Sequence, residues 1–338
     1  MNTIGRMFRV SVLGESHGKC VGALIDGCPA GLEFPSALIE AELGRRKSGA
    51  KGTTARRESD EPMVMSGVFN GKTTGAPILI LFENADADSS SYEKLKNTPR
   101  PSHADFASMK KYGRFADYRG GGHFSGRLTA GIVAAGAIAK SLLSKMEVRA
   151  HVIEAGGVKI NGEPMEDSGF VDVLDSAIEE GDSLGAIVEC RVSGVPAGLG
   201  EPFFDSLESA ISHVAFSLPG IKGVEFGAGF SCARMRGSEF NDAIVDASGK
   251  TSTNNSGGIN GGIGNSNELV FRVAVRPAAS INKLQETVDL ETGKKTEISI
   301  GGRHDACIAL RVPVVLEAAC AIVLLDMMLL EGKMKRVV

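Results

Sequence analysis

Four of the six histidines lie in segments rich in glycine or proline, where a side chain reaches a ligand more readily than from a regular element. His17 lies within Gly14–Gly18, and its imidazole can give or take a proton near neutral pH. A turn histidine bonded only to backbone would fit the same spacing. Asp105, two residues after His103, could fix the tautomer of that imidazole or cap the following helix. We expect His17 and His103 to carry proton chemistry.

The other two loop histidines stand beside arginines. His123 lies within Arg119–Arg127 and His304 within Gly301–Asp305, and both segments contain runs of glycine. Glycine-rich loops that lead into helices can bind an anion through backbone N–H groups, and arginine adds bidentate binding of phosphate or carboxylate. Residues 256–264 form a third glycine-rich segment, and residues 45–57 are strongly basic. Together these segments predict a small polyanionic ligand.

The usual nucleotide, metal and disulfide signatures are missing from the sequence. The segment Gly67–Thr73 resembles a phosphate-binding loop but is one residue short, and no His/Glu cluster has the helical spacing of a zinc site. None of the six cysteines forms a Cys-x-x-Cys pair, and several lie in apolar runs. We therefore expect buried free thiols, no metal ligands and a reducing compartment.

The composition is that of a soluble globular protein. The 338 residues are 43% hydrophobic and 23% charged, with a net charge of −4, which excludes wholesale disorder and disfavours binding to nucleic acid or a membrane surface. Residues 312–330 are almost wholly apolar but contain Glu317 and Asp326. Two acids are costly within a membrane span, so the segment predicts a buried core helix. We expect a cytoplasmic protein.

Local patterns predict an α+β fold with mainly antiparallel sheets, in a single domain covering residues 1–338. The expected strands are 8–13, 21–26, 63–69, 77–82, 148–153, 186–192 and 269–275, and the expected helices are 36–43, 127–146, 205–218 and 312–330. Long loops are expected at about 45–60, 84–126 and 242–266. A shift of 184 residues aligns Arg127 and its helix with Arg311 and the last helix, which indicates either chance or an internal duplication placing two core helices side by side.

Taken in order, these loops resemble one known family, chorismate synthase. The segments that carry the resemblance span nearly the whole chain: Asn2–Gly5, Gly14–Gly18, Arg45-Arg46, Ser66–Phe69, Arg100–Asp105, Tyr118–Gly122, Lys222–Glu225, Gly257–Gly262 and Arg303–Asp305. The resemblance implies a β-α-β sandwich, a homotetramer, and the conversion of 5-enolpyruvylshikimate 3-phosphate to chorismate by loss of phosphate and a ring proton. It also implies reduced FMN as cofactor, without net redox change, and NADPH as a possible reductant.

The resemblance assigns roles to individual residues. His17 would protonate the departing phosphate, His103 would supply a proton to the reduced flavin, and Asp305, supported by Ser16, would help take the flavin proton. The substrate anions would bind Arg45, Arg46 and Arg127. The flavin would contact His123, Phe124, Ser125, Pro219, Gly220, Gly261, Arg276, Pro277, Ala278, Ala279, Ser280 and Arg303.

The chain departs from the family pattern at two flavin segments. His123-Phe124-Ser125 stands where many members have Arg-Ser-Ser, and residues 276–280 read Arg-Pro-Ala-Ala-Ser instead of Lys-Pro-Thr-Ser-Ser. Three other functions remain open at this point: an NAD(P)H-dependent flavin reductase or other FMN enzyme, a phosphotransferase, and a non-catalytic anion-binding protein. Steady NAD(P)H consumption would distinguish the first, and ATP binding the second.

Overall fold

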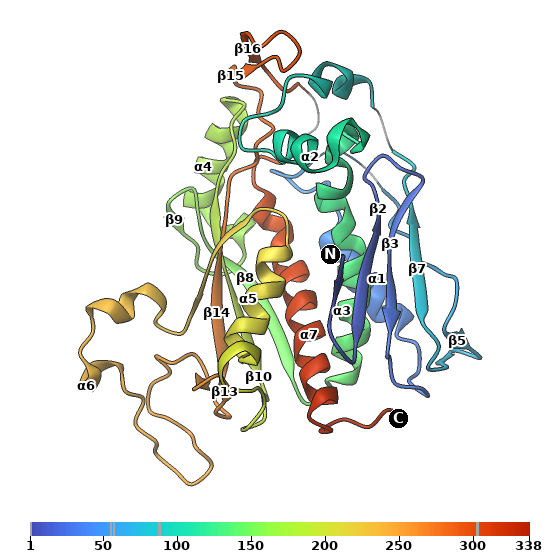
Figure 1. Cartoon of the computed structure of the whole chain (residues 1–338). Helices are drawn as coiled ribbons and strands as arrows, with labels where there is room; N and C mark the ends of the chain where they lie inside the picture. The colour runs from blue at the N-terminus through green and yellow to red at the C-terminus, as the bar shows by residue number, and fades with distance from the viewer. Residues whose placement is uncertain (1, 55, 57, 87–88, 302–303) are drawn as a thin grey trace.

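Two five-stranded sheets form the outer layers of the molecule, with helices between them (Figure 1). The structure is a computed structural model that describes residues 2–54, 56, 58–86, 89–301 and 304–338. The first sheet has the order β1 (Thr3–Ile4), β2 (Arg9–Gly14), β3 (Cys20–Asp26), β7 (Ile78–Glu83) and β4 (Met63–Val64). The second has the order β11 (Ile221–Phe226), β14 (Leu269–Val275), β10 (Ala186–Ser193), β8 (Glu147–Ala155) and β9 (Val158–Lys159). All neighbouring strands in both sheets are antiparallel, so the predicted β-α-β sandwich is confirmed.

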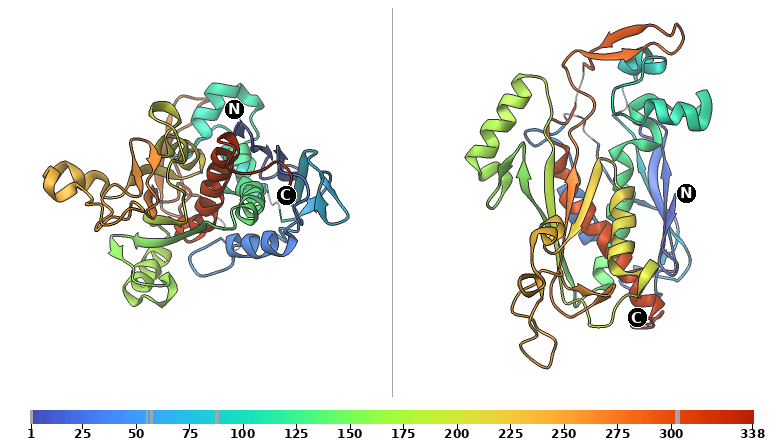
Figure 2. Two further views of the ribbon diagram at one scale, coloured as in Figure 1. Left: turned by 90° about the horizontal axis from the view of Figure 1, so that it is seen from below. Right: turned by 60° about the vertical axis from the view of Figure 1, so that its left-hand side comes forward.

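Two long helices fill the middle layer. Helix α3 (Thr129–Leu142) packs on the first sheet and α7 (Val312–Leu330) on the second, while α1 (Ser36–Arg46) and α5 (Leu207–Ser217) flank them (Figure 2). Helices α3 and α7 approach so closely that a Cβ built on Gly136 would lie 2.3 Å from the Cβ of Ala318. The two core helices therefore lie side by side, as the duplication alternative requires, and the duplication itself stays a prediction.

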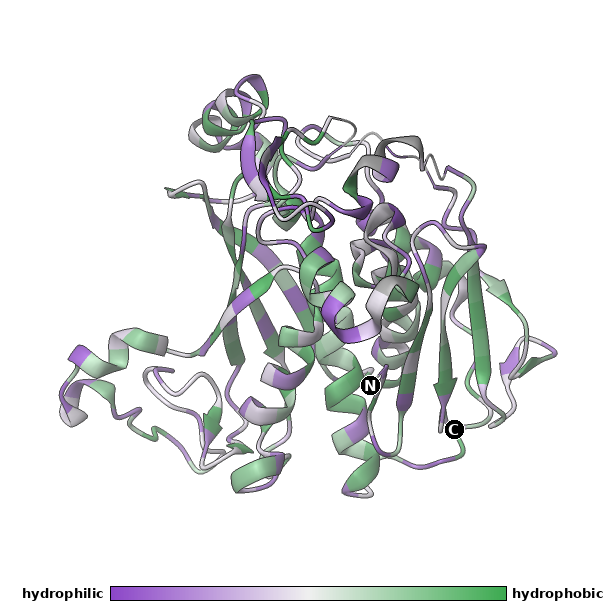
Figure 3. Cartoon of the chain, turned by 45° about the horizontal axis from the view of Figure 1, so that its top comes forward, coloured by the Kyte–Doolittle hydropathy of each residue, from purple (hydrophilic) through white to green (hydrophobic). Residues whose placement is uncertain are grey.

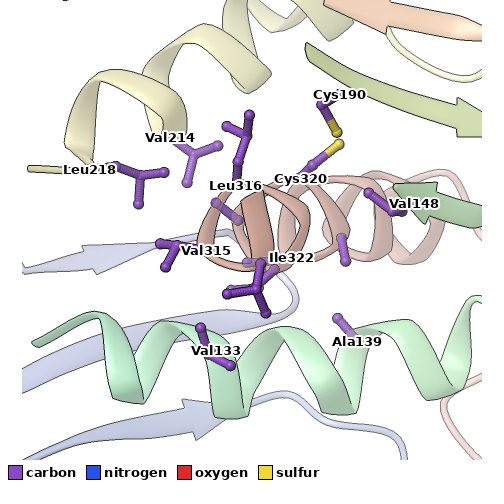
Figure 4. Packing of buried hydrophobic residues seen from close by; sticks show 14 of the residues in the cluster. Val133, Ala139, Val148, Cys190, Val214, Leu218, Val315, Leu316, Cys320 and Ile322 are labelled. Atoms are coloured by element: carbon purple, nitrogen blue, oxygen red, sulfur yellow. The ribbon is translucent and has the colours of Figure 1, made fainter. Parts of the chain in front are cut away.

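The buried surfaces of both sheets and the helices between them form one continuous apolar core (Figure 3). Together with the preceding turn, α7 is apolar and long enough to cross a membrane by composition, yet 72% of its most apolar window is buried within the protein. Its acids have partners: Asp326 accepts hydrogen bonds from the backbone N–H groups of Arg6, Met7 and Phe8. In the same core, Cys190 of β10 faces Cys320 of α7 (Figure 4). The predicted core helix is therefore confirmed. The expectation of buried thiols is wrong for Cys232, which is exposed.

The remaining helices and strands complete the fold. They are β5 (Val68–Phe69), β6 (Lys72–Thr73), α2 (Asp105–Tyr112), α4 (Ser168–Glu179), α6 (Gly237–Phe240), β12 (Ile259–Asn260), β13 (Ile263–Gly264), β15 (Gln285–Val288) and β16 (Lys295–Ile298). The 3₁₀ turns are η1 (Ser90–Lys96), η2 (Gly113–Phe115), η3 (Arg119–Phe124), η4 (Gly126–Leu128), η5 (Pro164–Glu166), η6 (Phe203–Asp205), η7 (Gly229–Arg234) and η8 (Ile308–Arg311).

Two predicted segments differ from the structure. The strand expected at 63–69 is two short strands, because Gly67 adopts a φ of +81° and Ser66 bonds across to the backbone of residues 77 and 79. The expected loop 84–126 contains helix α2 and three 3₁₀ turns within its bounds. Short helical turns of this kind bury too little apolar surface to leave a periodic pattern.

Candidate active site

A cavity of about 910 Å³ lies at one end of the middle layer, where α1 ends and where α3 and α7 begin. Arg46 comes from the last turn of α1, Arg127 from the turn η4 before α3, and Arg311 from the turn η8 before α7. The N-termini of α3 and α7 therefore both lie at this cavity, and helix N-termini favour negative charge. The predicted loops 45–60 and 84–126 supply much of the lining, whereas none of the described lining residues comes from 242–266.

His17 lies in the connection between β2 and β3 and lines the cavity. Its Nδ1 lies 2.9 Å from the hydroxyl oxygen of Ser89, and Tyr92 packs edge-on against the ring with centroids 5.2 Å apart. The other side of the ring faces Gly120 of η3. The imidazole is thus held between two loops that enclose the cavity, with its orientation fixed by the contacts around it.

Ser16 and Asp305 both line the cavity but contact different neighbours. The Ser16 hydroxyl accepts a hydrogen bond from Arg56 Nη1 at 2.9 Å, and Arg56 is in turn paired with Glu58. The Asp305 carboxylate accepts a hydrogen bond from the backbone N–H of Thr54 at 2.9 Å and lies 3.6 Å from Arg311 Nη1. Thr54 and Arg56 therefore each contact one of the two predicted residues, Asp305 and Ser16 respectively.

His103 forms a cluster with Arg100 and Asp105 at another wall. Its Nδ1 lies 2.6 Å from Asp105 Oδ1 and 3.0 Å from Arg100 Nη2. The shorter contact is to the carboxylate, which only accepts hydrogen bonds, so we assign the proton to Nδ1. Burial lowers the pKa of His103, and the nearby Arg100 lowers it further, against the opposing effect of Asp105. Burial alone would raise the pKa of Asp105, but hydrogen bonds from Arg100 and His103 hold it well below its usual range. At neutral pH His103 is thus neutral, with Nε2 available to accept a proton.

Arg46 and Arg127 meet on one buried carboxylate. Asp60 Oδ2 accepts a hydrogen bond from Arg46 Nη2, and Asp60 Oδ1 accepts one from Arg127 Nη1. Arg127 also donates to Asn84 and to the backbone carbonyl of Glu83. The structure therefore brings two of the three predicted substrate arginines together.

The third predicted arginine, Arg45, is not among the described residues that line the cavity. Its guanidinium donates to both carboxylate oxygens of Glu317, each at 2.7 Å, and to Glu42 at 3.0 Å. Lys140 binds the same two acids, and the Glu317 side chain is 1% exposed. Arg45 thus neutralises a buried acid of α7 instead of facing a ligand.

The predicted flavin residues divide into those that line the cavity and those that lie elsewhere. His123 bonds to the Gly14 carbonyl at 2.8 Å and to Asn2, and Pro277 and Gly261 are also outside the described lining. Arg303 lies outside the described residues. The predicted residues that do line the cavity are Phe124, Ser125, Pro219, Gly220, Arg276, Ala278, Ala279 and Ser280.

Sequence reasoning missed several lining residues. Arg56, Arg100 and Arg311 were not among the predicted site residues, although each left a signal. Arg56 belongs to the basic stretch, Arg100 begins the segment that contains His103, and Arg311 aligns with Arg127 under the shift of 184 residues. In total, the described lining holds seven arginines or lysines against four aspartates or glutamates, so the cavity suits a ligand with several anionic groups.

Comparison with known proteins points to one family. A family model described as chorismate synthase matches residues 8–329. A chorismate synthase of Chitinophaga pinensis is 58% identical over 338 residues, covering 100% of this chain and 99% of the relative. One from Methanosarcina mazei is 48% identical over 354 residues, covering 98% and 97%. A crystal structure of chorismate synthase superimposes with a TM-score of 0.75 at 28% identity, covering 97% of this chain and 93% of that one.

Proposed function

The chain belongs to the chorismate synthase family, and from that premise we propose how its cavity converts 5-enolpyruvylshikimate 3-phosphate to chorismate and phosphate. The reaction is that of a carbon–oxygen lyase: the C–O bond to phosphate breaks, a ring proton leaves, and a new double bond forms. The observation that carries the proposal is that His17 and His103 line one arginine-rich cavity. A flavin reductase, the main rival, is not favoured by the relatives found.

The residues present fit a reduced FMN cofactor. Apolar side chains from Leu218, Ile308 and Val315 offer a surface for a flat ring, while Arg276 offers a phosphate ligand. His304 also lines the cavity, and its buried Nε2 has no hydrogen-bond partner within the described part of the chain, so a bound polar group would satisfy it. When bound, reduced FMN would supply electron density that offsets the charge developing as phosphate leaves.

The protein residues would then bind the anions and move protons. Arg46 and Arg127 would hold oxyanions of the substrate, and His17 would donate a proton to the departing phosphate oxygen. His103, with Nδ1 fixed on Asp105, would accept a proton at Nε2 and supply it to the reduced flavin. Asp305, held in place by the Thr54 backbone, would help take the flavin proton.

Histidine variants test this function. His17→Ala and His103→Ala should each reduce turnover about 10²- to 10⁴-fold, as expected for loss of a general acid or base. His213→Ala is the matched control, because His213 is exposed on α5 and is not among the described lining residues. Near-full turnover by either cavity variant would contradict the proposal.

The assembly, reductant and location form the finer part of the proposal. We propose a homotetramer, supported by the adjacent exposed side chains of Phe203 and Phe204, which a partner subunit would cover. NADPH is proposed as the source of reducing equivalents for FMN. A cytoplasmic location is supported by free thiols at all six cysteines.

A further inference from the structure

Asp60 is buried at the cavity wall, with its side chain 1% exposed, and each of its oxygens binds a different arginine. Burial raises the pKa of this carboxyl, but Arg46 and Arg127 together hold the pKa below its usual value, so Asp60 is ionised. The Asp60 carboxylate is thus one anion between two cations. Without this carboxylate, Arg46 and Arg127 would repel each other in a site shielded from water.

The backbone at Asp60 is unusual in a way that places this carboxylate. Its φ is +51°, in the left-handed region that residues other than glycine seldom adopt, although Asp and Asn tolerate it better than most. Such conformations persist where the surrounding contacts hold them, and they are common at functional sites. Here the turn precedes β4 and directs the side chain to the two guanidinium groups.

Arg46 has hydrogen-bonding capacity that the described part of the protein does not use. Its Nη2 donates to Asp60, but its buried Nε and Nη1 find no partner among the described residues. Burial lowers the pKa of Arg46 to about 10, and Asp60 opposes that effect. Unpaired buried donors cost free energy, and an oxyanion at this wall would satisfy them.

We propose that Asp60 is a positioning residue that binds Arg46 and Arg127 together at the cavity wall, so that their remaining N–H groups meet oxyanions of the substrate. The inference rests on the proposed function, because that function supplies the phosphate and carboxylate groups of the substrate. It adds a residue that does not itself touch the substrate and acts through two that do. Asp60 therefore sets substrate affinity, with a smaller effect on the proton-transfer steps.

Substrate binding without turnover is the direct test. Calorimetry would measure the Kd of 5-enolpyruvylshikimate 3-phosphate with oxidised FMN present. Asp60→Asn keeps the side-chain size and tolerates the left-handed backbone, and it should weaken binding about 10- to 100-fold. The KM measured with reduced FMN should rise by a similar factor, while kcat changes less. Asp60→Glu keeps the charge but displaces the carboxylate by one methylene, and it should also weaken binding.

The control is Asp326→Asn, which removes another buried carboxylate that lies outside the described cavity lining. That variant should lose stability and keep the wild-type Kd within about twofold. Wild-type affinity in both Asp60 variants would overturn the inference. If Asp60→Asn fails to fold, the Kd of Asp60→Glu alone tests the inference, and a wild-type value there would overturn it. Tight substrate binding by a wild-type chain that releases no phosphate would overturn the proposed function alone.

Discussion

The ring of His17 fills the space that any side chain at residue 120 would need. A Cβ built on Gly120 would lie 2.3 Å from His17 Cδ2 and 2.5 Å from Nε2, and Gly120 has a φ of +58°. The glycine run of η3 thus allows the loop to close directly onto the imidazole. This contact explains why a glycine is required next to the proposed acid.

Gly120→Ala should therefore displace His17 and reduce turnover at least about 10-fold, since small misplacements of a catalytic group are costly. Gly157→Ala is the matched control: Gly157 has a φ of +82°, but a Cβ built there would meet no described atom within 4 Å. Both variants strain the backbone, but only Gly120→Ala places a methyl group against His17. Equal turnover in the two variants, measured by phosphate release, would show that the contact does not matter.

His103 should stay neutral down to a lower pH than an ordinary histidine does. Its pKa should lie below the usual value of about 6.5, because burial and Arg100 disfavour the charged form. Asp105→Asn removes the carboxylate that opposes this effect, so the pKa should fall further. NMR titration of the imidazole protons would measure both values, and a rise in the variant would contradict the assignment.

The same shift affects stability in a defined direction. The unfolded chain binds a proton at His103 at a higher pH than the folded chain does. The stability contributed by neutral His103 is therefore present above about pH 6.5 and is lost as the pH falls below that value. Urea unfolding would give the free energy of unfolding of wild type and of His103→Ala at about pH 7.5 and about pH 5.5, on either side of the ordinary histidine pKa. The stability advantage of wild type over the variant should shrink or reverse at the lower pH.

Arg45→Ala should reduce stability and leave substrate affinity nearly unchanged. Glu317 would keep Lys140 as a partner, and Arg45 is itself 40% exposed, so the expected loss is about 1–2 kcal/mol. Arg46→Ala should instead raise KM about 10-fold or more, because Arg46 lines the cavity and would lose a charge-assisted contact with the substrate. A rise in KM for Arg45→Ala without loss of stability would contradict this division.

Assembly should depend on the exposed aromatic pair of η6. Phe203 and Phe204 are 85% and 94% exposed, and Phe203 holds a φ of +62°, which is costly for a bulky residue. Replacing both with serine should shift the proposed tetramer to smaller species in light scattering. Phe69→Ser, at another exposed aromatic position, is the comparison; an identical effect there would remove the specific role of η6.

The neighbours Arg45 and Arg46 show where sequence reasoning stops. Both belong to one basic stretch, but successive helix residues point about 100° apart, so only one of them faces the cavity. Which one does depends on how α1 packs against α3 and α7, and no local pattern states that packing. The buried acid Glu317, 272 residues away from Arg45, decides the outcome.

Long apolar elements were predictable, because the local sequence itself indicates that they are buried. Helix α7 was predicted with its observed bounds, because its burial requires a continuous apolar sequence. Helix α4 was missed although Phe170, Leu174 and Ala177 form a buried stripe after the capping residue Asp167. The hairpin of β15 and β16 was missed because its short strands are mostly polar and none of their residues is buried.

Anaerobic turnover of the protein with chemically reduced FMN and 5-enolpyruvylshikimate 3-phosphate tests the proposed reaction directly. Phosphate release and chorismate absorbance would be followed together, with oxidised FMN as the control. We expect both products to appear in equal amounts, and only with the reduced flavin. Demonstrated FMN binding with neither product formed would contradict the proposed reaction.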